Sequence, residues 1–214
     1  MKKLSTSKQM AINMVAAIVS FLIGTGINFV LAPYLVKELG SETYGFIGLA
    51  NNFVQYATIV TSALNSMSGR FISIEYSKGN IDKASRYFSS VLVADLIIAG
   101  VLLLVSSIIT FNIEFILNVP ENLVDSVKIL FALTFATFII SVITAIFTTA
   151  AFVKNKLYIN SLRDIASNTL KLLLVVILFS FFPAKVYFLA MASLASGIFL
   201  LLTNIKVKKK FCRK

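Results

Sequence analysis

Two charged side chains stand alone inside long apolar stretches of the sequence, and their possible chemistry is the easiest to define. Asp95 is the only charge between Tyr87 and Ile113, and Lys171 is the only charge in the stretch 165–182. A charge in the core of a membrane costs about 2.5–3.5 kcal/mol on insertion scales, and such charges pair or bind ions. Asp95 is therefore a candidate for binding a proton or another ion, and Lys171 for receiving an anionic group.

The two charges lie at similar depths along their helices, so they can also form an ion pair with each other. Asp95 lies eight residues beyond Tyr87, roughly 12 Å along a helix at 1.5 Å per residue. Lys171 lies seven residues beyond Asp164. The alternatives to binding functions are a static internal ion pair between Asp95 and Lys171, or a Lys171 stem that extends to the membrane interface.

A polar face on one predicted helix is the second candidate surface. Its residues recur at alternating spacings of four and three, which places them on one side of a helix. They are Tyr44, Gly48, Asn51, Gln55, Thr58, Ser62, Asn65 and Gly69. Because carboxamides are costly toward lipid, this face is predicted to be hydrated, with Asn51, Gln55 and Asn65 contacting a substrate. Arg70 follows the last residue of this face in the sequence. It either contacts the same anion as Lys171 or is an ordinary cationic anchor at the membrane interface.

Two other stretches carry milder polar faces, for which close helix packing through small residues is the favoured interpretation. The first stretch has Asn13, Ser20, Gly24, Gly26 and Asn28, and the later one has Thr134, Thr137, Ser141, Thr144 and Thr148.

The elements that must position these residues are membrane-spanning helices. The chain has 214 residues, of which 58% are hydrophobic and 14% charged, with a mean hydropathy of +0.90. This is more apolar surface than a soluble domain of this size can bury. Stretches of about 20 apolar residues are long enough to span a bilayer. The predicted spans are 10–36, 44–69, 87–113, 129–153, 165–182 and 186–205, which form a single all-α, six-helix transmembrane lobe over residues 1–214.

The distribution of lysine and arginine predicts the orientation of this lobe. All basic residues except Lys37, Lys128 and Lys185 fall on one side of the membrane if the six spans alternate. Basic loops remain in the cytoplasm, so both termini are predicted to be cytoplasmic. The first apolar stretch is longer than the core of a signal peptide, and we interpret it as a retained helix.

The same residue counts exclude several function classes. The net charge of +11 reflects this topology and does not indicate a nucleic-acid partner, because the basic residues flank apolar stretches. Histidine is absent, and Cys212 is the single cysteine. We therefore expect no catalytic residues, no metal site and no cofactor, and the protein is predicted not to be an enzyme.

Residues around the first two spans resemble polysaccharide and O-antigen flippases of the Wzx type, within the multidrug, oligosaccharidyl-lipid and polysaccharide exporter superfamily. The stretch "NFVLAPYLVKELGSETYGFIGLANNFVQY" contains the short loop pattern L-G-x-x-x-Y-G that is typical of these proteins. The stretch "SGRFISIEYSKGNIDKASRYFSS" is similar to their first inner loop. The resemblance continues through "VKNKLYINSLRDIASNTLK".

This resemblance implies a transporter of the bacterial inner membrane. It would move a polyprenyl-pyrophosphate-linked oligosaccharide from the inner to the outer leaflet, with alternating access coupled to an ion gradient. Arg70 and Lys171 would then contact phosphate, Asn51, Gln55 and Asn65 would contact sugar, and Asp95 would bind the coupling ion. The implied partners are membrane lipid, the lipid-linked oligosaccharide and polysaccharide assembly proteins.

The sequence matches only the N-terminal lobe of this two-lobed family, and such transporters bind substrate between their lobes. The expected explanations are a truncated chain, a second lobe on a separate polypeptide, or a homodimer. A drug or metabolite exporter of the same superfamily, and a non-transporting membrane scaffold or remnant, are the alternative functions. A membrane enzyme is disfavoured because no loop carries clustered carboxylates.

Overall fold

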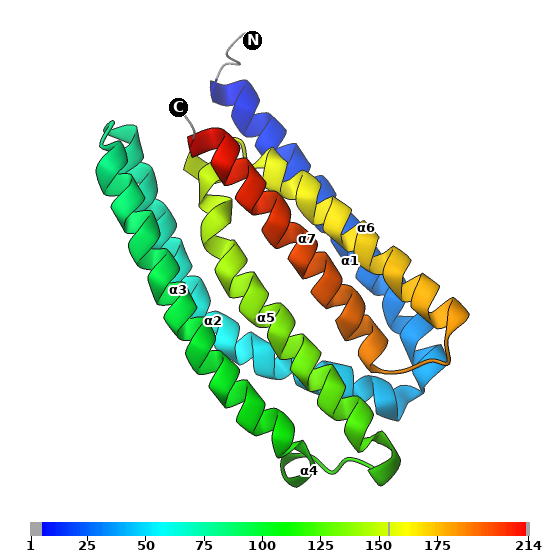
Figure 1. Ribbon diagram of the computed structural model, residues 1–214. Coiled ribbons are helices and arrows are strands. Elements are labelled where there is room, and N and C mark those ends of the chain that lie inside the picture. Colours follow the sequence, from blue (N-terminus) through cyan, green and yellow to red (C-terminus); the bar gives the residue numbers. More distant parts are fainter. Residues whose placement is uncertain (1–5, 154, 213–214) are drawn as a thin grey trace.

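The computed structural model describes residues 6–153 and 155–212, and every regular element in them is helical (Figure 1). The six long helices are α1 (Thr6–Leu39), α2 (Ser41–Ser77), α3 (Ile81–Phe111), α5 (Val124–Val153), α6 (Tyr158–Phe181) and α7 (Tyr187–Cys212). The short α4 (Ile113–Ile116) and a 3-10 turn, η1 (Glu121–Leu123), connect α3 to α5. The predicted all-α fold is confirmed.

Five of the long helices are long and apolar enough to cross a membrane within the described ranges: α1, α3, α5 together with η1, α6 and α7. α2 has 37 residues but is not one of these five. Its length is sufficient, so the limiting feature is the polar face that includes Asn51, Gln55 and Asn65. Five predicted spans therefore coincide with membrane-capable helices, and a membrane crossing by α2 stays a prediction.

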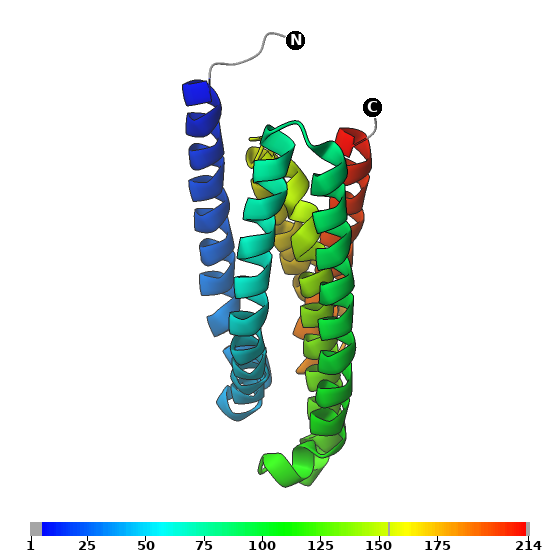
Figure 2. The same ribbon diagram turned by 90° about the vertical axis from the view of Figure 1, so that its left-hand side faces the viewer.

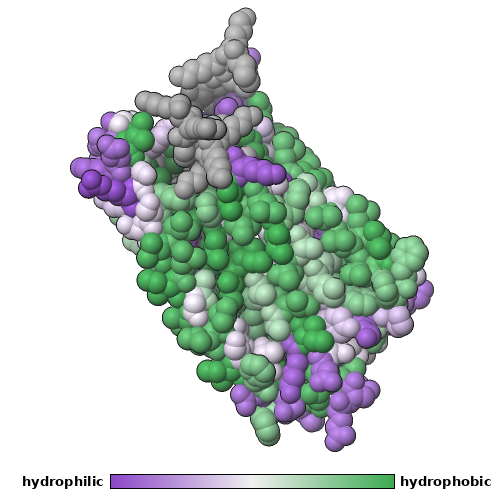
Figure 3. Space-filling view, viewed as in Figure 1, coloured by the Kyte–Doolittle hydropathy of each residue, from purple (hydrophilic) through white to green (hydrophobic). Residues whose placement is uncertain are grey.

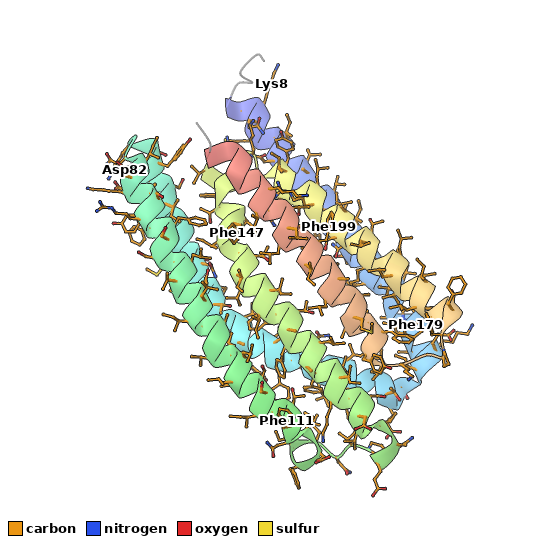
Figure 4. The ribbon with its side chains drawn as sticks, in the orientation of Figure 1. Lys8, Asp82, Phe111, Phe147, Phe179 and Phe199 are labelled. Atoms are coloured by element: carbon orange, nitrogen blue, oxygen red, sulfur yellow. The ribbon has the colours of Figure 1, made fainter. Side chains whose placement is uncertain are left out.

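The long helices alternate in direction, so α1 begins and α7 ends at the same end of the bundle (Figures 1 and 2). We call this the basic end, since the α2–α3 turn with Lys78 and the α5–α6 turn with Lys156 also lie there. Figure 4 labels Lys8 and Asp82 at this end and Phe111 toward the opposite one. This arrangement agrees with the prediction that most basic residues lie at one end of the helices. The cytoplasmic location of the basic end stays a prediction.

The surface between the two ends is largely apolar, as the green area of Figure 3 shows. Phe21, Phe29 and Leu104 are 70%, 81% and 65% exposed. Large apolar side chains in contact with water would be unfavourable over so wide an area. This surface therefore suits contact with lipid.

α5 lies at the centre of the bundle and packs against α7, α2 and α3, whereas α6 packs against α7 and α1. The core at the end opposite the basic one joins α2, α5 and α7 through Ile47, Phe131 and Ala190. Toward the basic end, Ile72 and Ala84 pack with Ile146 of α5. Because α5 and α7 stand between them, α3 and α6 are not neighbours.

α2 curves along its length, so that one half lies beneath α5 and the other beside α3 (Figure 1). Hydroxyl groups in the middle of α2 donate hydrogen bonds to backbone carbonyls of the preceding turn, an arrangement that commonly bends helices. These bonds are Thr58 to Val54 (2.8 Å), Thr61 to Thr58 (3.2 Å), Ser62 to Ile59 (3.1 Å) and Ser66 to Ser62 (2.8 Å).

Candidate functional site

A cavity of about 530 Å³ lies among α2, α5, α6 and α7, and we call it the central cavity. Its polar lining residues are Asn51, Thr58, Thr134, Thr137, Ser141, Thr144, Thr148, Ser167, Asn168, Lys171, Ser193 and Ser196. Its volume is in the range of small-molecule binding pockets, which is about 300–1,000 Å³. Apolar side chains such as Val54, Leu130 and Leu189 complete the wall.

The hydroxyl face of α5 forms one side of this cavity. All five of its residues line the central cavity. α5 also packs on α7, where the Thr137 methyl group would lie 3.7 Å from a Cβ atom placed on Gly197, so the favoured interpretation of helix packing stays a prediction. Thr137, Ser141 and Thr144 donate their hydroxyl hydrogens to backbone oxygens of α5 at 2.7–2.8 Å. Their oxygen atoms therefore remain available as acceptors for donors inside the cavity.

Lys171 is the one charged side chain among the described residues that line the central cavity. No hydrogen bond or ion pair joins its ammonium group to another described residue. Lys171 is half-buried. A cation withdrawn from water without a carboxylate partner is costly, and an anion entering the cavity would reduce that cost. The cavity can therefore bind an anionic group beside neutral polar groups.

A second cavity of about 410 Å³ lies between α2 and α5, and we call it the α2–α5 cavity. It is lined by Asn65, Thr61, Ser62 and Thr149, and it shares Thr58 with the central cavity. Phe138, Ser141, Ala145 and Thr148 also line both cavities. The two cavities therefore follow one continuous polar wall of α5.

Asp95 lies outside both cavities and is completely buried, with 0% of its surface exposed. The neighbouring polar side chain is Asn65 of α2. Both carboxylate oxygens of Asp95 lack a hydrogen-bond partner in the described part of the chain.

The alternative in which Asp95 and Lys171 form an internal ion pair is wrong. Both carboxylate oxygens of Asp95 lack a partner among the described residues, whose ion pairs include Lys78 with Glu75 (3.2 Å) and Lys128 with Glu114 (3.1 Å). Similar depth does not bring the two charges together, because α3 packs on α2 and α5 whereas α6 packs on α1 and α7.

The remaining predicted site residues differ in their positions. Asn51 lines the central cavity and Asn65 lines the α2–α5 cavity. Gln55 and Arg70 are exposed and line neither. The structure thus brings Asn51 and Lys171 to one cavity, and their contact with a substrate stays a prediction.

Sequence reasoning missed the cavity residues of α6 and α7 other than Lys171. Asn168 precedes Lys171 by three residues, a spacing that places both on one face of a helix and was a usable signal. Its amide nitrogen would lie 3.1 Å from a Cβ atom placed on Gly24, so the glycine lets α1 approach α6 closely. Ser193 and Ser196 of α7 have the same spacing of three, so they too lie on one face of a helix.

A polar clasp at the basic end joins α1 to the turn between α5 and α6. Asn13, which is 6% exposed, donates to the backbone oxygen of Asn155 (3.1 Å) and to its side-chain oxygen (2.9 Å). The Oδ1 atom of Asn13 accepts from the amide of Tyr158 at 3.1 Å. Nearby, Arg163 donates to Asn204 and thereby connects α6 to α7. These bonds fix the end of α6 that leads to Lys171.

Outside the predicted spans, Glu75 organises the α2–α3 turn. Its carboxylate accepts hydrogen bonds from Asn80 (3.0 Å) and Lys78 (3.2 Å), and these lower the pKa of Glu75. Gly79 in this turn has a φ of +81°, which glycine adopts without strain.

Comparison with known proteins gives a family match over nearly the whole chain. Residues 10–213 match the family model described as polysaccharide biosynthesis protein. The chain is 33% identical over 187 residues to an uncharacterized membrane protein, EpsK, of Bacillus subtilis (strain 168). That alignment covers 87% of this chain and 37% of EpsK, so the chain spans well under half of its relative's length. No solved structure matches the chain.

Proposed function

The chain belongs to the polysaccharide biosynthesis protein family, and we propose that it forms one lobe of an exporter of lipid-linked oligosaccharide. The exporter moves a polyprenyl-pyrophosphate-linked oligosaccharide from the inner to the outer leaflet of the bacterial inner membrane. The basic end then faces the cytoplasm, where basic segments are retained.

The observation that carries this proposal is the composition of the central cavity. Lys171 supplies positive charge for a pyrophosphate group, and charge-assisted hydrogen bonds to phosphate are the stronger kind. Amides and hydroxyl oxygens, among them Asn51, Asn168 and Thr144, suit the hydroxyl groups of a sugar. This combination matches a ligand that is anionic at one point and rich in hydroxyls elsewhere.

The other predicted site residues on α2 lie outside the central cavity. Asn65 extends the polar wall into the α2–α5 cavity. Gln55 and Arg70 lie on exposed faces of α2, where they can meet headgroups or a second lobe. We propose that the cavity is completed by a second lobe, supplied by further sequence, by a separate chain or by a second copy. Polysaccharide assembly proteins are the expected partners of the complete exporter.

Restoration of surface polysaccharide tests this function. A strain without its own flippase, given the complete gene, is expected to regain surface polysaccharide. Lys171→Gln is expected to lower the restored amount roughly tenfold or more, since a hydrogen bond to a charged group contributes about 1.5–3 kcal/mol. Lys171→Arg should retain part of it.

The matched control is Lys206→Gln, which removes a lysine from the exposed basic end of α7. It should leave restoration unchanged at equal membrane abundance. Equal restoration by the Lys171 and Lys206 variants would contradict a role of Lys171 in substrate binding. Failure of the unchanged gene to restore polysaccharide, despite normal expression, would contradict the substrate assignment.

The apolar part of the cavity wall favours a second candidate, a drug or metabolite exporter. Val54, Leu130 and Leu189 would then contact an amphipathic cation or neutral compound. This function predicts altered drug resistance with no polysaccharide phenotype, and Lys171→Gln would then increase the export of cations.

A further inference from the structure

A polar groove of about 470 Å³ lies between the packed helices α1 and α6, and we call it the α1–α6 groove. Its polar lining residues are Ser20, Thr25, Asn28, Ser161, Asp164 and Asn168. None of their side chains has a hydrogen bond to another described residue. Hydroxyl and amide groups both donate and accept, so the groove offers unused hydrogen-bonding groups to a ligand.

Asp164 is the one charged side chain among the described residues that line this groove. It is exposed, and no ion pair of the described residues includes it. The adjacent Arg163 donates to Asn204 of α7, so it attracts Asp164 only through space. An exposed carboxylate among hydroxyls and amides is unfavourable toward hydrocarbon chains. The groove therefore suits a polar ligand better than a lipid tail.

An aromatic side chain gives the same groove an apolar surface. Phe21 lines it, is 70% exposed and packs on no other aromatic ring of the described residues. Gly24, one turn later on α1, also lines the groove and places no side chain beside the ring. A sugar has hydroxyl groups at its edge and an apolar C–H face, which can pack on an exposed ring.

We propose that the α1–α6 groove is a sugar-binding subsite and that Asp164 determines which sugars it accepts. The carboxylate accepts hydrogen bonds from sugar hydroxyl groups, while Asn28 and Asn168 both donate and accept. An ammonium group could bind Asp164, but it has no acceptor for the amide hydrogens of Asn28 and Asn168. A sugar that carries a carboxylate would be repelled by Asp164, so the subsite takes neutral sugars and excludes acidic ones.

The groove adjoins the central cavity, because Asn168 lines both. Lys171 lies seven residues beyond Asp164 on α6, about 10 Å along the helix at 1.5 Å per residue. An anionic group at Lys171 thus avoids close repulsion by Asp164, and sugars attached to it reach the groove past Asn168. This placement of the substrate rests on the proposed export function, whereas sugar binding in the groove does not.

Saturation-transfer NMR on the purified full chain in lipid vesicles, prepared without sugar-based detergent, tests the subsite. The probes are cellobiose, a neutral disaccharide, and cellobiouronic acid, in which a carboxyl group replaces one hydroxymethyl group. The wild type is expected to bind cellobiose roughly tenfold more tightly than the acid, since like charges in contact oppose binding. Asp164→Asn keeps the shape of the side chain and should bring the two affinities within about twofold of each other. Phe21→Ala should weaken cellobiose binding about fivefold.

Two matched controls separate these effects from general changes in charge or apolar surface. Asp82→Asn removes an exposed carboxylate at the basic end of α3, and Phe115→Ala removes a ring of α4 that is 84% exposed. Both variants should keep the wild-type affinity for cellobiose and the wild-type preference over the acid.

Absence of cellobiose binding by the wild type, a measurement that needs no variant to fold, would overturn the proposal. Equal binding of the two disaccharides by the wild type, or an unchanged preference in Asp164→Asn, would also contradict it. Tighter binding of choline than of cellobiose would assign the groove to cationic groups instead. Sugar binding together with failed polysaccharide restoration would contradict only the export function.

Discussion

The clasp around Asn13 allows the effect of one substitution to be worked out from the structure. Asn13→Ala removes three hydrogen bonds to the α5–α6 turn: two donated to Asn155, at 3.1 and 2.9 Å, and one accepted from the amide of Tyr158, at 3.1 Å. These bonds join α1 to the first turn of α6. The substitution also removes a longer bond within α1, accepted from Gln9 at 3.4 Å. Asn155 also has a φ of +52°, so the turn depends on local contacts to hold this residue in the left-handed region.

The expected loss follows from the usual strength of such bonds. Hydrogen bonds between helices of membrane proteins contribute about 0.6 kcal/mol each on average. Loss of all three therefore costs about 2 kcal/mol, which corresponds to about a 30-fold increase in the population of the opened turn. We expect the effect to be local, because the apolar contacts between α1 and α6 through Leu31 and Val175 are unaffected.

Hydrogen exchange followed by mass spectrometry measures this opening at the amides of the α5–α6 turn. Asn13→Ala should accelerate exchange at Tyr158 about 30-fold, with little change in α3. The control is Asn28→Ala, which removes an exposed asparagine from the same helix. Equal exchange rates at Tyr158 in the two variants would refute the reasoning, since they would mean that the clasp contributes no stability.

Two further predictions concern helix packing and the α2–α3 turn. Gly24→Ala should destabilise the protein by about 1 kcal/mol, because the new Cβ atom would lie 3.1 Å from the amide nitrogen of Asn168. Gly26→Ala, which has open space around it, should be neutral or stabilising by about 0.5–1 kcal/mol. Thermal unfolding of the two variants in detergent compares these effects. Hydrogen bonds from Asn80 and Lys78 lower the pKa of the Glu75 carboxyl group. Their contribution to folding stability is therefore present above the usual glutamate pKa, and it is lost as the pH falls through the lowered pKa. A carbon NMR titration of the Glu75 carboxyl group should show this lowered pKa, and Asn80→Ala should raise it; an unchanged titration would mean that Asn80 does not stabilise the carboxylate.

Sequence periodicity predicted the helices well because lipid imposes a simple requirement on them. Every spanning segment needs a long apolar run, and the runs 129–153 and 186–205 lie within η1–α5 and along α7. The boundaries were less accurate at charged ends. α6 begins at Tyr158, seven residues before the predicted span, because its first two turns carry Arg163 and Asp164 while remaining helical.

The candidate site was predictable only where one helix face carried the signal. Asn51 and Asn65 follow from the polar face of α2, and Lys171 from its isolation in an apolar run. The spacing of Asn168 from Lys171 places the two on one face of α6. That Ser196 of α7 reaches the same cavity follows from the packing of α6 beside α7, a relation between helices that no periodicity within one helix contains.

The positions of the two intramembrane charges show how much depends on helix order. Rise per residue gave Asp95 and Lys171 similar depths along their helices. Depth does not fix their lateral positions, however, and α5 and α7 separate the helices that carry them. A paired carboxylate and ammonium would neutralise each other and leave little to bind. Kept apart, Lys171 retains its charge for an anion in the central cavity, while Asp95 is buried with Asn65 as its polar neighbour. Both charges nevertheless approach the same polar wall of α5, Lys171 directly and Asp95 through Asn65. A shift of α5 would therefore alter the environments of both charges at once.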